Sequence, residues 1–207
     1  MDVSERLGMY AGFLYQPVFL VFTLTSIYLH PGFNLREHAV SDLGAMGVEN
    51  AWIFNVGVLM SCLLGIIFAL LFLRHLPRPF GSVGIWLTVS SALFFIVAVV
   101  PDNAPIYIYG DMTVHRFFAI TGFTIGSIIV LLFAIFWILT PRWRVVGAIM
   151  LIICFLPALA WIYGGPGIAM FELVFSFAVL VWSYLSIFFG VRCGGSLNVE
   201  SDGHTGK

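Results

Sequence analysis

Five polar side chains stand out in a very apolar sequence because their types suit acid–base catalysis. The imidazole of His115 is a candidate base or metal ligand, and carboxylates can act as acids or ligands. The candidate catalytic residues are His115, Asp42, Glu172, Asp102 and Ser41, with Ser41 as a polar supporter. His38, Asn55 and Arg116 are candidates for binding a ligand or supporting the site.

Several of these candidate residues lie in the segment between His38 and Ala45, in which His38 and Asp42 are four residues apart. If the segment is helical, these two side chains share one face of the helix. The alternative is a turn in which the Asp42 carboxylate accepts backbone hydrogen bonds and Gly44 adopts a positive φ. The segment alone does not distinguish a catalytic loop from a well-capped turn.

His115 stands at the start of an apolar stretch, and Asp111 or Thr113 precedes it as a candidate helix cap. The positive end of a helix dipole disfavours a protonated histidine, so we expect a neutral imidazole there. Arg116 is a candidate partner for Asp102, for Asp111 or for an anionic group of a ligand. A purely structural role at the helix start is the alternative for His115.

Glu172 follows Gly167 by five residues, which places it about 7 Å into the last apolar stretch. An acid at full membrane depth costs about 2.5–3.5 kcal/mol, so we expect Glu172 to face the bundle interior with a partner or a proton. Ser176 and Ser183 continue the polar stripe inward. The alternatives are an acid that reaches the membrane interface, and an ion pair that only fixes helix packing.

The composition places the chain in a membrane. Hydrophobic residues make up 61% of its 207 residues and charged residues only 9%, whereas a soluble domain has about 25% charged residues. The formal net charge is −1 and the only lysine is Lys207, so nothing predicts nucleic-acid binding. We therefore expect membrane lipid as the partner of this protein.

Six apolar windows each have about the 20 residues that cross a bilayer. Backbone groups in lipid must be satisfied within each segment, so we expect helices, and the windows do not alternate as barrel strands do. The sequence thus predicts an all-α, polytopic bundle of antiparallel transmembrane helices at residues 7–29, 51–73, 81–100, 114–139, 145–163 and 168–191.

Basic residues predict the orientation of the bundle. Seven of the nine lie at one side, and only Arg36 and Arg116 lie at the other. By the positive-inside rule the first side is cytoplasmic, so we expect both termini in the cytoplasm. We expect the protein itself in the cell membrane. The domain boundaries that follow are a transmembrane domain at 1–192 and a disordered cytoplasmic tail at 193–207.

The candidate residues gather at the outer side under this topology. We expect a hydrogen bond from Asn55 to the Ser41–Gly44 loop, because Asn55 lies one turn into the second apolar window. Six of the ten acidic residues also lie on or near the outer side. We expect the loop containing Asp42 to fold onto the mouth of the bundle and to face His115.

These residues resemble the family catalogued as domain of unknown function 998, which consists of small multi-span prokaryotic membrane proteins. The resemblance rests on Ser41-Asp42-Leu43-Gly44-Ala45, Asn55, the Pro101-Asp102 turn and His115. The arginine expected after the last glycine turn is replaced by Glu172-Leu173. The resemblance implies a fold and a functional face, and it supplies no reaction.

A weaker similarity is to the membrane hydrolase superfamily that includes alkaline ceramidases. That similarity implies zinc as a cofactor, with His115, Asp42 and Asp102 as the possible ligands and Ser41 nearby. The paired histidines that the superfamily carries on its last helix are missing from this sequence, where Glu172 stands instead.

Three functions remain open from the sequence. The first is a lipid-directed hydrolase or a related intramembrane enzyme, which the mixture of residue types favours slightly. The second is a transporter or receptor for a small solute or proton, although no inverted repeat is visible. The third is a non-catalytic membrane protein whose polar residues only stabilise an interaction surface.

Overall fold

The computed structural model describes residues 1–165 and 167–201, and the side chains of residues 1–165 and 167–192. Six helices within this part are long and apolar enough to cross a membrane. This confirms the predicted all-α, six-span architecture. The helices are α1 Val3–Leu29, α2 Ala51–Leu71, α3 Phe80–Val99, α4 Val114–Leu139, α5 Arg144–Tyr163 and α6 Ala169–Ser201.

The short elements lie in the connections. Three 3₁₀ turns are formed by η1 Val40–Gly44, η2 Leu73–His75 and η3 Pro141–Trp143. The strands β1 Tyr107–Tyr109 and β2 Met112–Thr113 form an antiparallel hairpin just before α4, with Tyr107 opposite Thr113.

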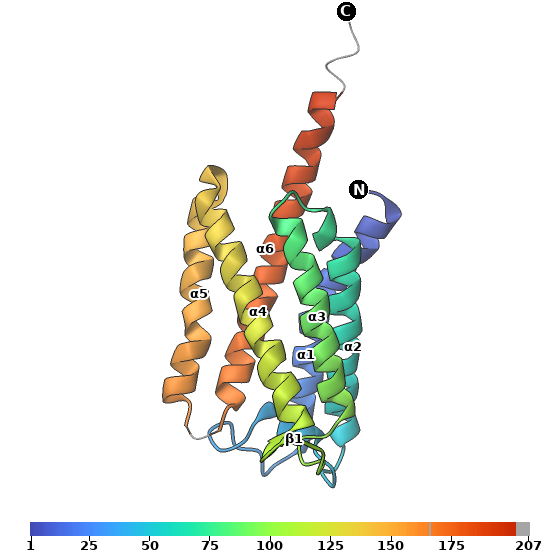
Figure 1. The fold of residues 1–207 in the computed structure, drawn as a ribbon, viewed down its shortest axis with the longest axis vertical. Coiled ribbons are helices and arrows are strands. Elements are labelled where there is room, and N and C mark those ends of the chain that lie inside the picture. Colours follow the sequence, from blue (N-terminus) through green and yellow to red (C-terminus); the bar gives the residue numbers. More distant parts are fainter. Residues whose placement is uncertain (166, 202–207) are drawn as a thin grey trace, which may run out of the picture.

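Each helix packs against its neighbour in sequence, and α6 also packs against α1, which closes the bundle. The helix α5 is the most peripheral, because its only fully buried residues are Gly147, Met150 and Pro157. Figure 1 shows α4 leaning away from α5 toward the end of the bundle that carries β1. That same end carries η1 and the hairpin.

Two apolar clusters hold the bundle together. The larger one is aromatic: the rings of Phe133 and Trp182 lie 5.2 Å apart and join α4 to α6, and Phe68 of α2 packs on Trp182. Lipid tails are as apolar as these side chains, so close packing, rather than exclusion of water, stabilises such contacts. The smaller cluster joins Val40 and Leu43 of η1 to Phe54 of α2 and Ala169 of α6.

The start of α1 and the end of α6 lie at the same end of the bundle, as an even number of spans requires (Figure 1). Their cytoplasmic placement stays a prediction. The domain boundary expected at residue 192 stays a prediction, and the backbone of α6 runs past this residue to Ser201. No proline follows Arg192 to stop the helix, and residues 202–207 of the predicted tail lie outside the described residues.

Candidate functional site

The loop between α1 and α2 is tied to the start of α6 by its backbone. The amide of Gly167 donates to the carbonyl of Arg36 at 2.6 Å, and the amide of Ala169 donates to the carbonyl of His38 at 3.0 Å. A Cβ at Gly167 would lie 2.5 Å from backbone atoms of Glu37 and His38, so only glycine permits this approach. The loop thereby folds back onto the mouth of the bundle.

The segment from His38 to Ala45 forms a turn, which is the second of the two conformations that the sequence left open. The Asp42 carboxylate accepts a hydrogen bond from the amide of Ala39 at 2.9 Å, which caps η1. The predicted positive φ of Gly44 is wrong. Glycine is needed there for a different reason, since a Cβ would overlap the side chains of Asn55 and Phe54 on α2.

Asn55 holds this turn from the side. Its side-chain amide donates to the carbonyl of Gly44 at 3.2 Å, which confirms the predicted hydrogen bond. His38 does not share a helical face with Asp42, because η1 begins only at Val40. The His38 ring instead accepts a hydrogen bond from the amide of Asn34 at 2.9 Å and stacks on Phe33.

Glu172 lies in the first turn of α6 with only 6% of its surface exposed. Its carboxylate accepts a hydrogen bond of 2.5 Å from the amide of Val40, the first residue of η1. One turn further in, the hydroxyl of Ser176 donates to the carbonyl of Glu172 at 2.8 Å. Glu172 is therefore buried toward the bundle interior with a partner, as the sequence predicted.

His115 is the second residue of α4 and is 4% exposed. Its Nδ1 lies 2.7 Å from the carbonyl oxygen of Val100. A carbonyl only accepts, so Nδ1 carries a hydrogen. Its Nε2 is buried without a hydrogen-bond partner in the described part of the chain, and it lies 3.7 Å from a carboxylate oxygen of Asp102.

The start of α4 orients this histidine. Thr113, one of the two predicted caps, accepts a hydrogen bond from the amide of Arg116 at 3.2 Å. The 3.7 Å separation between Asp102 and His115 is too long for a hydrogen bond.

An open pocket of about 830 Å³ brings most of the candidates together, and it is called the outer pocket after the side of the membrane that the sequence predicts for it. His115, Asp42, Glu172, Asp102, Ser41 and Arg116 all line it, whereas His38 and Asn55 do not. The last two act in the structure as supports of the loop. The remaining residues of the lining are Glu37, Ala39, Ala119, Ile120, Phe123, Thr124, Ser127, Ile128, Trp161, Gly167, Ile168 and Phe171.

The outer pocket is polar at one end and apolar along its side. Its ionisable residues come from the α1–α2 loop, from Asp102 and from the first turns of α4 and α6. Its wall continues along α4 to Ile128 and reaches Trp161 of α5. Ile120 and Trp161 are 57% and 58% exposed, so the pocket is open between α4 and α5 on a face that would meet lipid.

The donor set does not fit zinc. A catalytic zinc needs three protein ligands, and within residues 1–165 and 167–192 no three His, Cys, Asp or Glu side chains are placed to hold a metal ion. His115 and Asp102 approach one another, but no third ligand joins them. We derive no chemistry through a metal for this site.

Some lining residues were not singled out by sequence reasoning. Glu37 adds a fourth acid to the outer pocket, and Phe171 and Trp161 add aromatic walls. Glu37 was visible only as one of several acids in a loop. Trp161 resembled any aromatic residue at a membrane interface, so no sequence signal separated it from the others.

Comparisons with known proteins agree with this fold. Residues 14–188 match the model of a family described as "Protein of unknown function (DUF998)". Neither the curated proteins nor the solved structures that were compared contain a match.

Proposed function

Since the chain belongs to the DUF998 family of proteins of unknown function, we propose its function from the outer pocket: acid–base catalysis on the headgroup of an amine-bearing lipid. The observation that carries the proposal is the presence, in one pocket, of a buried histidine beside a partly buried aspartate and of an apolar wall that is open toward lipid.

The shape of the pocket favours an amphiphile over a water-soluble substrate. A headgroup would lie beside His115, Arg116 and Asp102 at the polar end. An acyl chain would follow the apolar wall, where Ile120 and Ile128 of α4 are exposed. Burial of such a chain stabilises the complex only modestly in a bilayer, so the headgroup contacts would supply the selectivity.

The charges at the polar end favour a headgroup with an ammonium. Four carboxyl groups line the pocket, from Glu37, Asp42, Asp102 and Glu172, against one guanidinium from Arg116. Carboxylates attract an ammonium, and an arginine pairs with phosphate in a bidentate geometry. A zwitterionic phospholipid with a primary amine presents both groups.

His115 is suited to accept the proton. With its hydrogen on Nδ1 and directed at Val100, the neutral ring has a lone pair on Nε2. When Nε2 takes a proton from a substrate hydroxyl or from water, the resulting imidazolium lies between the Val100 carbonyl and the Asp102 carboxylate. Both contacts stabilise the positive charge, and the same proton can then be donated to a leaving group.

The test uses the purified protein in bilayers that contain phosphatidylethanolamine, phosphatidylcholine and phosphatidylglycerol with identical acyl chains. Native mass spectrometry measures which lipids stay bound, and chromatography with mass spectrometry measures conversion of each lipid. We expect retention of the ethanolamine lipid over the glycerol lipid, and conversion that is lost in His115→Ala. His75→Ala is the matched control, because His75 lies in η2 at the opposite end of the bundle.

Three outcomes would contradict the proposal. Full conversion in His115→Ala removes the acid–base role, and equal retention of all three lipids removes the headgroup selectivity. Selective binding by the wild type without any conversion favours a non-catalytic lipid-binding protein. The transporter alternative would be favoured by flux of a solute or proton through the same vesicles without a change in any lipid.

A further inference from the structure

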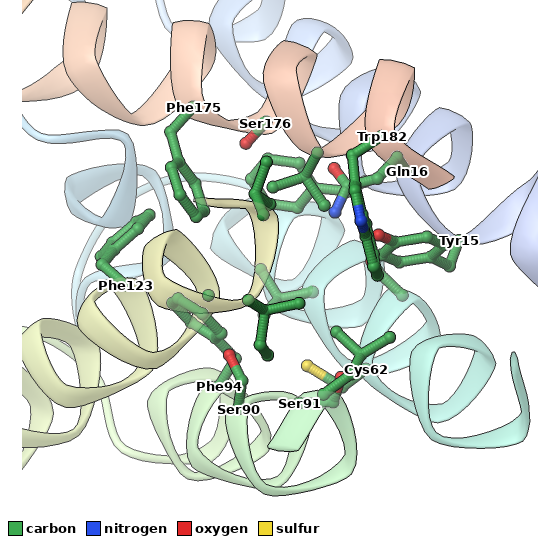
Figure 2. A pocket seen from close by; sticks show the side chains of 18 residues that line it. Tyr15, Gln16, Cys62, Ser90, Ser91, Phe94, Phe123, Phe175, Ser176 and Trp182 are labelled. Carbon is green, nitrogen blue, oxygen red and sulfur yellow. The ribbon is translucent and has the colours of Figure 1, made fainter. Parts of the chain in front are cut away.

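A second, smaller cavity lies in the middle of the bundle, between α1, α2, α3, α4 and α6, and is called here the central cavity. Its volume is about 100 Å³. Figure 2 shows Tyr15, Gln16 and Trp182 gathered at one end, with Phe94, Phe123 and Phe175 at the other. None of its lining residues is an acid, a lysine, an arginine or a histidine.

Three buried polar atoms of residues that line the central cavity make no hydrogen bond of good geometry with the described residues, although the side chains of Gln16 and Ser183 lie near the Tyr15 hydroxyl. They are the hydroxyl of Tyr15, the side-chain carbonyl oxygen of Gln16 and the indole N–H of Trp182. They come from two helices, α1 and α6, and both Tyr15 and Trp182 are fully buried. Together these groups offer a bound molecule one donor, one acceptor and one hydroxyl that can act as either.

These three polar groups would lower the stability of the folded protein in a membrane if the cavity were dry. An unpartnered buried polar group is destabilising, and lipid offers it no replacement. Cavities lined only by apolar groups stay empty, whereas roomy polar cavities hold water. Serine hydroxyls from α2, α3 and α6 also line this cavity, at Ser61, Ser90, Ser91 and Ser176.

We propose that the central cavity is a binding site for small uncharged hydrogen-bonding molecules, held by Tyr15, Gln16 and Trp182. Its volume of about 100 Å³ is more than a single water molecule needs, so it accommodates several waters or one small solute. The lining contains no acid, lysine, arginine or histidine, which excludes charged ligands, because no opposite charge would compensate for their lost hydration.

The central cavity is separate from the lipid-facing outer pocket. Phe123 lines both, and its ring packs edge to face on Phe94, Phe171 and Phe175 at 4.9, 5.5 and 5.2 Å. This aromatic cluster therefore forms the partition between the two spaces. The occupants of the two spaces differ accordingly, with an amphiphile outside and a small neutral molecule inside.

Water is the probe for the test, and Trp137 provides an internal control. The indole N–H of Trp137 is also buried without a described partner, but Trp137 does not line the central cavity. Water-edited solid-state NMR on protein with ¹⁵N-labelled tryptophan, in bilayers, measures magnetisation transfer from water to each indole. The two resonances are assigned by their loss in Trp182→Phe and in Trp137→Phe.

We expect transfer to the Trp182 indole to build up severalfold faster than transfer to the Trp137 indole. A cavity-filling variant, Ser61→Leu, should abolish the difference. Equal, slow build-up at both indoles in the wild type would overturn the proposal, and this comparison needs no variant to fold. Fast transfer that persists in a folded Ser61→Leu protein would also overturn it, because the water would then lie elsewhere.

Discussion

The backbone amide of Val40 donates a hydrogen bond to the carboxylate of Glu172, which joins the α1–α2 loop to α6 across 132 residues of sequence. The bond is buried, and it reinforces the two backbone hydrogen bonds that already tie Gly167 and Ala169 to the same loop. Glu172 thus has a structural role in addition to its place in the lining of the outer pocket.

Replacement of Glu172 separates its role as an acceptor from its role as an acid. Glu172→Ala leaves the buried amide of Val40 without a partner, which should lower the stability by about 1–3 kcal/mol. Glu172→Gln keeps a carbonyl oxygen at the same reach, so its unfolding temperature should lie between those of the wild type and Glu172→Ala. Thermal unfolding in detergent measures the order, and an alanine variant as stable as the wild type would contradict the role in tying the loop.

Two glycines allow the loop to approach the helices, and a third offers a matched control. Gly167→Ala and Gly44→Ala each place a Cβ against the loop backbone or the Asn55 side chain, whereas Gly32→Ala meets nothing within 4 Å. We expect the first two variants to increase proteolytic cleavage between residues 30 and 50, because the displaced loop loses its contacts. The third should match the wild type.

If Gly167→Ala is cleaved no faster than Gly32→Ala, the close approach of the loop to α6 is wrong. If all three variants are cleaved faster, the effect comes from the replacement of glycine by alanine and not from the loss of space.

The protonation of His115 is open to a direct measurement. The carbonyl of Val100 accepts from Nδ1, so the neutral ring should carry its hydrogen on Nδ1. The ¹⁵N chemical shifts of labelled histidine distinguish the two tautomers, and His115→Asn identifies the resonance. A neutral ring with its hydrogen on Nε2 would leave no lone pair facing the outer pocket, and the proposed base would be excluded.

The contribution of the Tyr15 hydroxyl to the stability of the protein tests whether the central cavity is occupied. If the hydroxyl bonds to a bound molecule, Tyr15→Phe loses about 0.5–1.5 kcal/mol of stability. If the cavity is dry, removal of an unpartnered hydroxyl should raise the stability. Tyr28→Phe is the control on the same helix. Tyr28 is exposed, so the effect of removing its hydroxyl does not depend on whether the central cavity is occupied.

The orientation of the bundle in the membrane is predicted from the distribution of basic residues, and cysteine labelling tests this prediction. In a background without native cysteines, Tyr109→Cys and Arg78→Cys introduce thiols at opposite ends of the bundle, and both positions are exposed. A membrane-impermeant maleimide added to intact cells should label Tyr109→Cys and leave Arg78→Cys unlabelled. The reverse pattern would place the outer pocket in the cytoplasm and both termini outside.

The positions of the helices could be predicted from the sequence because apolar length is a local property. The predicted span of residues 114–139 coincides with α4, and four of the other spans agree to within a few residues. The predicted span of residues 168–191 starts within one residue of α6 but ends ten residues before it. The hydrogen bond from Asn55 was also accessible, because its partner turn lies just before α2 and a short connection limits the choices.

The outer pocket depended on the tertiary structure, because its lining comes from five separate segments of the chain. Nothing local shows that Val40 meets Glu172 or that Trp161 faces the same space as His115. The ring of His38 is engaged within its own loop, which the alternative of a shared helical face did not anticipate.

The central cavity was missed for the same reason, although Gln16 was a signal as a lone amide within the first apolar span. By itself the sequence determined a six-helix membrane protein of the DUF998 family, because hydropathy and short motifs are read along the chain. Only the tertiary structure decided which polar groups share a pocket, because their convergence depends on how the helices pack against one another.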